Sequence, residues 1–296
     1  MSTVIFFNDA NSFYEQAHHL WEGAETRNNL ILGLSLRLMS DLHAYGEAIP
    51  LMALVTDESG DAKASALMTP PFALIVQSDP LDKSALGKLA DTLMANDWSL
   101  PGVNGIAEES DCFAEIWQEK TGRQARRIVN TRAYELRKVS QISYPSGKMK
   151  VAEETDAQIA ADMLNAMAEE VIAGPKRLQT AQSMLDTIQK KCVFFWVDDG
   201  EVVSLTIANR PQIKGICVSG VYTPPAFRRR GYARALVAEV SKELLSRGYE
   251  FTNLFTDLSN PTSNKIYQEI GYQPVCDYHQ YEFIDHALVK SNNPAL

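Results

Sequence analysis

Residues 228–233, Arg-Arg-Arg-Gly-Tyr-Ala, lie between a stretch expected to form a strand and a stretch expected to form a helix. The apolar run 213–223 predicts the strand, two prolines end it, and residues 233–245 predict the helix. The first backbone N–H groups of a helix lack intrahelical partners and carry the positive end of the helix dipole. Because Gly231 has no Cβ, an anion can reach these groups. The stretch therefore predicts a helix N-terminus that binds phosphate.

The three arginines beside the glycine support this prediction. Arginine supplies charge-assisted, bidentate donors to a pyrophosphate or a ribose phosphate. Basic residues at a helix start oppose the dipole unless an anion is present. The alternative is a solvated basic patch, and a pattern as short as R-x-x-G-x-A does not decide between the two. The surrounding elements have to do so.

The second half of the chain places this loop in a regular order of elements. Apolar, β-branched runs separated by residues 198–200 (DDG) and 209–211 (NRP) predict a three-stranded meander. A helix, a strand, a second helix and a last strand follow, so that the order is β-β-β-α-β-α-β. The expected ranges are 193–197, 201–208 and 213–223 for the meander, then 233–245, 251–256, 261–270 and 278–284.

Two motifs in series resemble the GNAT acyl-CoA-dependent N-acetyltransferases. The first is the strand, the segment 223–227 (TPPAF), the R-x-x-G-x-A loop and its helix. The second is the segment 260–272 (NPTSNKIYQEIGY). The resemblance covers about residues 148–285, and it implies a mixed α/β domain that transfers an acetyl group from acetyl-CoA to an amine by direct attack.

The resemblance also implies roles for individual residues. In the family the pantetheine arm pairs with the end of the fourth strand, and amides of the loop hold the pyrophosphate. Asn260 matches an asparagine that bonds the pantetheine, and Tyr267 matches a tyrosine that protonates the leaving thiolate. The structural alternatives are a helix N-cap for Asn260 and a core aromatic for Tyr267. The expected acetyl-CoA contacts are Val221, Tyr222, Thr223, Arg228, Arg229, Arg230, Gly231, Tyr232, Ala233, Arg234 and Asn260.

The chain departs from the family at the general base. Many members carry a glutamate on the fourth strand, whereas residues 214–223 contain no carboxylate. Asp257, after the fifth strand, and Glu169 or Glu170, on a helix expected to cover the acceptor site, are the candidates for the base, directly or through a water. Each also fits a cap or a solvated helix face.

The first half repeats the element order of the second. Expected strands at 51–55, 63–68 and 73–77 precede a helix at 81–95, a strand at 103–107, a helix at 111–121 and a strand at 134–139. A helix starting at Ser12, with Glu15 completing a capping box and an apolar stripe to Leu38, is expected before them. We therefore predict an α/β (α+β) fold of two GNAT-like domains, each with a mixed, mostly antiparallel central sheet flanked by helices.

The two expected domains, 1–144 and 148–296, differ at the loop. Where the second has Arg-Arg-Arg-Gly-Tyr-Ala, residues 77–82 of the first read Gln-Ser-Asp-Pro-Leu-Asp. Acidic residues repel an anion, and no glycine is present to admit one. The sequence thus predicts a degenerate first domain that lacks the CoA phosphate loop and a second that binds acetyl-CoA.

Composition sets further limits. The net charge of −9 argues against a nucleic acid partner, and it favours a cationic acceptor such as an amine. Four scattered cysteines and five histidines predict no metal site. Without a long apolar stretch or a signal-peptide pattern, we expect no membrane association and a cytoplasmic location.

The predicted function is an N-acetyltransferase that uses acetyl-CoA and the primary amine of a small molecule or peptide. The alternatives are an aminoacyl or other acyl transferase of tandem GNAT type, and a non-catalytic CoA-binding sensor module. The missing carboxylate favours the sensor. The sequence leaves the oligomeric state open.

Overall fold

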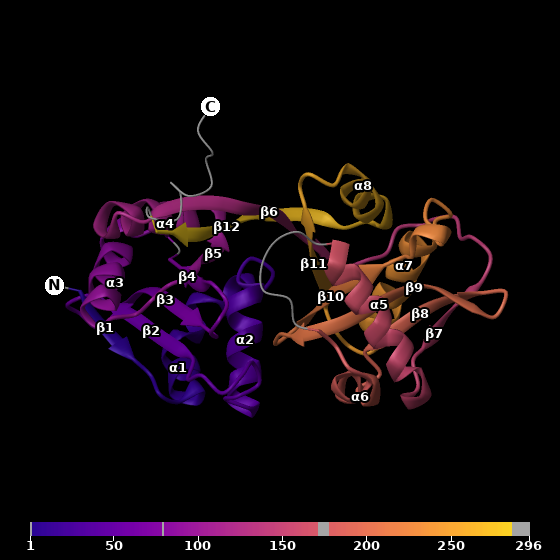
Figure 1. Ribbon diagram of the computed structural model, residues 1–296, viewed down its shortest axis with the longest axis horizontal. Helices are drawn as coiled ribbons and strands as arrows, with labels where there is room; N and C mark the ends of the chain where they lie inside the picture. Colours follow the sequence, from indigo (N-terminus) through magenta and orange to yellow (C-terminus); the bar gives the residue numbers. More distant parts are fainter. Residues whose placement is uncertain (1, 79, 171–177, 286–296) are drawn as a thin grey trace. The chain divides into compact units, whose positions relative to one another are not determined.

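A computed structural model describes residues 2–78, 80–170 and 178–285 (Figure 1). The chain divides into two compact units, Met1–Arg132 with the residues from Cys276 onward, and Ala133–Val275. Strand β6 (Gln124–Leu136) crosses this boundary, and most of the last strand, β12 (Gln273–Ile284), belongs to the first unit. The division therefore differs from the expected break near residues 144–148. Strand periodicity specifies which face of a strand is buried but not which sheet the strand joins.

The first unit contains a mixed sheet. Its strands lie in the order β1-β2-β3-β4-β5-β12-β6, and only β4 and β5 pair in parallel among the pairings recorded for the described residues. β12 pairs antiparallel with β5. The strands not yet given are β1 (Thr3–Phe6), β2 (Leu51–Thr56), β3 (Ala62–Met68), β4 (Leu74–Gln77) and β5 (Gly102–Ile106).

Helices cover both faces of this sheet. Alternate residues of β2 enter two different cores: Leu51 and Val55 pack with helices α3 and α4, and Met52 and Leu54 pack with α1 and α2. This explains why every residue of β2 is buried. The helices are α1 (Ala10–Ala17), α2 (Asn29–Ser40), α3 (Lys83–Ala95) and α4 (Ala107–Thr121).

The expected helix from Ser12 through the leucine stripe was wrong in two respects. Asp9 caps α1, because its carboxylate accepts the backbone N–H of Ser12 at 2.8 Å. Two short 3-10 turns, His18–Leu20 and Glu22–Ala24, separate α1 from α2. Trp21 lies between these turns, is fully buried and donates its indole N–H to Ser65 Oγ at 3.0 Å. This tertiary contact overrides the continuous helical pattern.

The sheet of the second unit has the strand order β11-β10-β9-β8-β7, and β11 lies beside the end of β6, so the strand order is continuous with that of the first unit. Strands β10 and β11 are parallel, and β10-β9-β8-β7 are antiparallel. The five strands are β7 (Lys148–Val151), β8 (Val193–Asp198), β9 (Glu201–Pro211), β10 (Gly215–Tyr222) and β11 (Phe251–Asp257). The meander and the strand after it thus form as the sequence predicted.

Two pairs of helices pack on this second sheet (Figure 1). Helices α7 and α8 share one core with Ile216, Val218 and Leu254, whereas α5 and α6 share another with Phe195 and Leu205. The helices are α5 (Ala157–Glu170), α6 (Ala181–Gln189), α7 (Tyr232–Ser246) and α8 (Pro261–Ile270), with 3-10 turns at Glu154–Asp156 and Pro225–Phe227. The predicted class, mixed and mostly antiparallel sheet with flanking helices, is confirmed.

Candidate active site

Strands β10 and β11 separate part way along their length. Their parallel pairing runs from Gly215 and Phe251 to Cys217 and Asn253. Beyond these residues both strands continue, but they no longer pair with each other. On its other side β10 carries a bulge. Ser219 pairs with Ile207 of β9 and Tyr222 pairs with Leu205, so two β10 residues lie opposite the single β9 residue between them. Strand edges that lack partners can pair with an extended ligand.

The N-terminus of α7 lies after this strand. Gly231 is the N-cap residue, with φ +85°, and no side chain caps the helix. A Cβ built on Gly231 would have no atom within 4 Å, so the space in front of the helix start is open. Arg229 also has a positive φ, +63°. The first N–H groups of α7 are therefore available to an anion.

The loop arginines do not all point to that opening. Both Glu170 oxygens accept from Arg228 Nη2, at 2.7 and 2.8 Å, and the Thr223 carbonyl accepts from Arg228 Nε. Arg230 donates to the Ala226 carbonyl, and Arg234 pairs with Glu269. Within the described part of the chain, Arg229 has no hydrogen-bond or ion-pair partner.

In the first unit, the helix start that corresponds to the start of α7 is already capped by a side chain. Asp82 caps helix α3, since its carboxylate accepts the Ala85 N–H at 2.9 Å, and Ser78 Oγ accepts the Asp82 N–H. β4 and β5 stay close, since a Cβ on Gly105 would lie 2.9 Å from the Val76 carbonyl oxygen. An anion would meet the Asp82 carboxylate there. Asp79, part of the acidic stretch noted above, lies outside the described residues.

Asn260 and Asp257 both hold the turn that starts α8. Asn260 Oδ1 accepts the Ser263 N–H at 3.1 Å, which makes Asn260 the N-cap. Asp257 Oδ1 accepts the Ser259 N–H at 2.7 Å, and the Asn264 amide donates to the Asp257 carbonyl. Both residues therefore stabilise the turn before α8, which is the structural role that the sequence left as the alternative to a role in the site.

Tyr267 and Tyr272 sit together but are bonded differently. Their rings meet edge to face with centroids 6.0 Å apart. The Tyr272 hydroxyl contacts Ser241 Oγ and Thr252 Oγ1, each at 2.9 Å, whereas the Tyr267 hydroxyl has no hydrogen-bond partner among the described residues. Burial raises the pKa of Tyr267 well above its usual value and that of Tyr272 to about 12. Tyr267 is thus a protonated donor available to a ligand.

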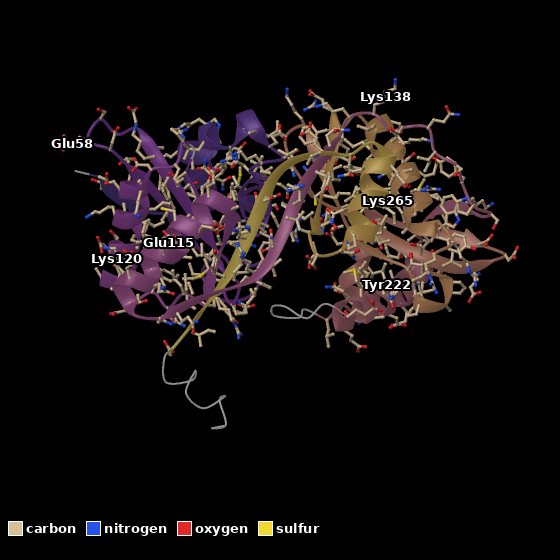
Figure 2. All side chains as sticks on the ribbon, turned by 90° about the horizontal axis from the view of Figure 1, so that it is seen from above. Glu58, Glu115, Lys120, Lys138, Tyr222 and Lys265 are labelled. Atoms are coloured by element: carbon tan, nitrogen blue, oxygen red, sulfur yellow. The ribbon has the colours of Figure 1, made fainter. Side chains whose placement is uncertain are left out.

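Glu170 is bound to the arginine loop and to the end of β10. Besides Arg228, it accepts a hydrogen bond at 3.3 Å from the hydroxyl of Tyr222, which Figure 2 labels in the second unit. Burial, and then the Glu170 charge, raise the pKa of Tyr222. The end of α5 is thereby tied to the end of β10. Both oxygens of the Glu170 carboxylate are thus engaged by Arg228.

Sequence reasoning missed a polar cluster where β10 and β11 separate. Arg210 Nη2 lies 2.9 Å from Cys217 Sγ, and Asn253 Nδ2 donates to Gln212 Oε1 at 2.8 Å. Cys217, Gln212 and Asn253 are all buried. The sequence holds one signal for the cluster, polar residues inside otherwise apolar strands.

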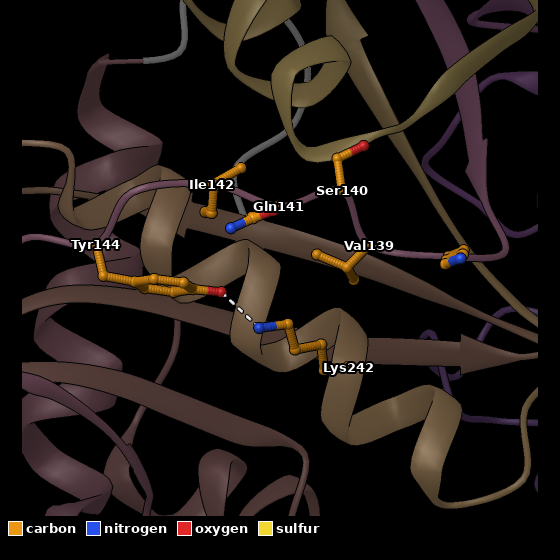
Figure 3. Close-up of a pocket in the computed structure, with 7 residues that line it drawn as sticks. Val139, Ser140, Gln141, Ile142, Tyr144 and Lys242 are labelled. Atoms are coloured by element: carbon orange, nitrogen blue, oxygen red, sulfur yellow. Dashed lines mark hydrogen bonds between the residues drawn. The ribbon is translucent and has the colours of Figure 1, made fainter.

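A cavity of about 500 Å³ lies elsewhere in the second unit, between the segment 138–144 and α7 (Figure 3). Lys242 lines it and donates to the Tyr144 hydroxyl at 2.7 Å. Lys242 follows Tyr232 by ten residues, or roughly 15 Å of helix. The cavity is therefore separate from the start of α7.

Comparisons with known proteins agree with this geometry. Residues 162–272 match the acetyltransferase (GNAT) family, which supports the predicted resemblance to that family and the prediction of an acyltransferase. No match is found among curated proteins.

Solved structures resemble nearly the whole chain. A GCN5-related N-acetyltransferase from Sphaerobacter thermophilus has a TM-score of 0.61 at 17% identity, covering 95% of this chain and 94% of that one. An acetyltransferase of the GNAT family from Colwellia psychrerythraea has a TM-score of 0.58 at 14% identity, covering 95% and 99%. A tandem GNAT protein from the clavulanic acid biosynthesis pathway has a TM-score of 0.58 at 10% identity, covering 95% and 98%. At these identities the likeness concerns the fold.

The described residues contain no helix with both the length and the apolar character needed to cross a membrane. They also contain no group of three or more histidine, cysteine, aspartate or glutamate side chains placed to hold a metal ion.

Proposed function

We propose that the protein is an N-acetyltransferase that transfers an acetyl group from acetyl-CoA to a primary amine, and that only the second unit binds the cofactor. The observation that carries this proposal is the uncapped start of α7, which follows the end of β10 where that strand has separated from β11. An open helix N-terminus suits a pyrophosphate, and a gap between parallel strands suits an extended amide-containing arm. The start of α3, which the Asp82 carboxylate caps, offers neither an open helix N-terminus nor a gap between strands.

The residues around the gap fit the parts of CoA. The pyrophosphate would meet the backbone N–H groups from Arg229 to Arg234 and the Arg229 guanidinium. The pantetheine arm would pair with the backbone of Val221–Thr223. The side chain of Asn260, at the start of α8, would bond the same arm. Arg228 and Arg230 would contribute charge near the phosphates while bound to Glu170 and the Ala226 carbonyl.

The chemistry then needs three groups. The amine attacks the thioester carbonyl, a backbone N–H of β10 near Tyr222 stabilises the oxyanion, and Tyr267 protonates the departing thiolate. A buried phenol whose pKa is raised remains protonated at neutral pH, as a proton donor requires. Asp257 and Glu170 are engaged in the contacts described above, so we assign neither the role of a dedicated base, and the amine loses its proton to water.

A thiol-release assay with acetyl-CoA and a panel of primary amines tests the proposal. The expected result is amine-dependent release of CoA, with mass spectrometry showing the acetylated amine. A protein that binds CoA and releases no thiol with any amine would contradict it.

That outcome would instead support a CoA-binding sensor, the second candidate. The absence of an acidic residue from β10 favours the sensor.

A cytoplasmic location also remains a proposal, which subcellular fractionation of the native host tests.

A further inference from the structure

Two buried hydroxyls of β9 hold the end of β10. Thr206 Oγ1 donates to the Ser219 carbonyl at 2.9 Å, and Ser204 Oγ donates to the Tyr222 carbonyl at 3.0 Å. Thr206 and Ser204 are both fully buried within β9. A hydroxyl buried inside a sheet needs a hydrogen-bond partner, because an unpaired one is costly. Here the partners are the two carbonyls on either side of the β10 bulge.

The bulge changes the direction of the β10 backbone between these two carbonyls. Val218 and Val221 both pack against the core that contains α7, whereas regular alternation would place residues three apart on opposite faces. Gly220 has φ +61°, a value that favours glycine. A Cβ on Gly220 would lie 2.9 Å from Leu164 Cδ2, so the α5 side has no room for a side chain.

The Thr206 hydroxyl determines where one N–H group of β10 points. The peptide unit between Ser219 and Gly220 is trans and planar, so its N–H points away from its carbonyl. Because Thr206 holds the Ser219 carbonyl towards β9, the Gly220 N–H points to the opposite edge of β10. At that edge β11 is no longer paired, since the pairing of the two strands ends at Cys217 and Asn253. The Gly220 N–H therefore faces the gap between the strands.

The Ser204 hydroxyl orients a second N–H group in the same way. It holds the Tyr222 carbonyl towards β9 and also contacts Thr223 Oγ1 at 2.9 Å. The N–H of that peptide unit belongs to Thr223, so it too points to the edge of β10 that faces the gap. The N–H groups of Gly220 and Thr223 are separated by up to roughly 10 Å along the strand. They can thus contact different parts of one extended ligand.

We propose, building on the acetyltransferase function above, that the Gly220 N–H is the donor to the thioester oxygen and that Thr206 is the positioning residue that orients it. Ser204 orients the Thr223 N–H towards the pantetheine arm. When the amine nitrogen bonds to the thioester carbon, the carbonyl oxygen gains a negative charge, which it loses again when the C–S bond breaks. An N–H whose direction is fixed beforehand stabilises this charge most effectively.

Thr206→Val tests this role, because valine keeps the branched shape and removes only the hydroxyl. Loss of an oxyanion donor costs about 10²- to 10³-fold in kcat, and a donor that is present but no longer held should cost less. We expect kcat to fall by about 10- to 100-fold in the thiol-release assay with acetyl-CoA and the fastest primary amine of the panel. The Kd of CoA, measured by calorimetry, should stay within about threefold, since CoA has no thioester carbonyl. Thr206→Ser restores the hydroxyl and should recover most of the lost kcat.

Thr252→Val is the matched control for the loss of a buried hydroxyl from this sheet. Thr252 is fully buried in β11, and its Oγ1 lies 2.9 Å from the Tyr272 hydroxyl. A hydroxyl with a purely structural role lowers the melting temperature when it is removed and leaves kcat unchanged. We expect this pattern for Thr252→Val, whereas Thr206→Val should combine a lower melting temperature with the loss in kcat.

Ser204→Ala tests the other end of the bulge and does not depend on the folding of Thr206→Val. It should weaken CoA binding by at least about threefold, because the Thr223 N–H is no longer held, and it should lower kcat less than Thr206→Val does. Thermal unfolding shows whether each variant is folded. A folded Ser204→Ala protein with an unchanged Kd for CoA would overturn the role of Ser204.

The outcomes distinguish this inference from the proposed function. A folded Thr206→Val protein that keeps kcat within about twofold of the wild type would overturn the role of Thr206. An equal loss of kcat in Thr252→Val, or no recovery in Thr206→Ser, would also overturn it. In all three cases the wild type would still acetylate amines, so the acetyltransferase function would stand. No release of CoA by the wild type with any primary amine would overturn the function and this inference together.

Discussion

Replacing Tyr267 by phenylalanine removes a proton donor and almost nothing else. The Tyr267 hydroxyl has no hydrogen-bond partner among the described residues, and the ring would keep its edge-to-face contact with Tyr272. Removing such a hydroxyl leaves no buried partner unpaired, so the free energy of unfolding should change by less than about 1 kcal/mol. A positioned general acid is worth about 10² to 10⁴ in rate, and kcat should fall by that factor.

Tyr272→Phe is the matched control, with the opposite expected pattern. Its hydroxyl meets Ser241 Oγ and Thr252 Oγ1, both buried, and removing it leaves these groups with one contact fewer. The expected cost is about 1 to 3 kcal/mol, which for a unit of this size lowers the melting temperature by several degrees. Because Tyr272 takes no part in the proposed chemistry, kcat should stay within about twofold, well below the effect of a general acid.

The assay must measure the chemical step. Rapid mixing of acetyl-CoA with a saturating amine shows whether CoA forms in a burst, which would reveal a slow release step that hides the loss. With chemistry rate-limiting, a Tyr267→Phe enzyme that keeps more than about half of its turnover would refute the role of Tyr267, since loss of a general acid costs at least tenfold.

Three further predictions concern the same site. Burial raises the pKa of Tyr267 above its usual value, so its proton is present below that pKa and lost only above it. We therefore expect kcat at saturating amine not to decline below about pH 10. A decline near pH 8, measured in buffers of constant ionic strength, would contradict this. Glu170→Gln frees Arg228 from its carboxylate partner, so the Kd of CoA should change by a few-fold, while a fall of about 100-fold in kcat would instead make Glu170 the base. Asp257→Asn keeps an oxygen for the Ser259 N–H, so kcat should stay within about threefold, and a larger loss would restore Asp257 as a candidate base.

Local chemistry made much of the second unit predictable. Apolar runs bounded by turn residues gave the meander, and Asn260 before Pro261 marked the start of α8, which begins at that proline. Gly231 marked the start of α7 within one residue of the expected position. These signals lie within a few neighbouring residues, so no tertiary contact was needed to interpret them.

Other features depend on contacts between distant residues. One partner of β12 is β5, about 170 positions earlier in the chain. The 3-10 turns before α2 form around Trp21, whose indole donates to Ser65. The pairing of Glu170 with Arg228 and that of Arg210 with Cys217 likewise join separate elements. A residue type shows what a side chain can bind, but only the fold brings its partner to it.

The central claim, one CoA site at the start of α7, is tested most directly by calorimetric titration of CoA into the wild type, Gly231→Asp and Gly200→Asp. Gly231 and Gly200 have nearly equal φ, +85° and +81°, and a Cβ at either position meets no atom within 4 Å, so the backbone strain of the two substitutions is matched. We expect one site per chain in the wild type and in Gly200→Asp, and at least about 100-fold weaker binding in Gly231→Asp, as an unpaired carboxylate beside the pyrophosphate would cause. Two equivalent sites per chain, or unchanged affinity in a folded Gly231→Asp protein, would contradict the account.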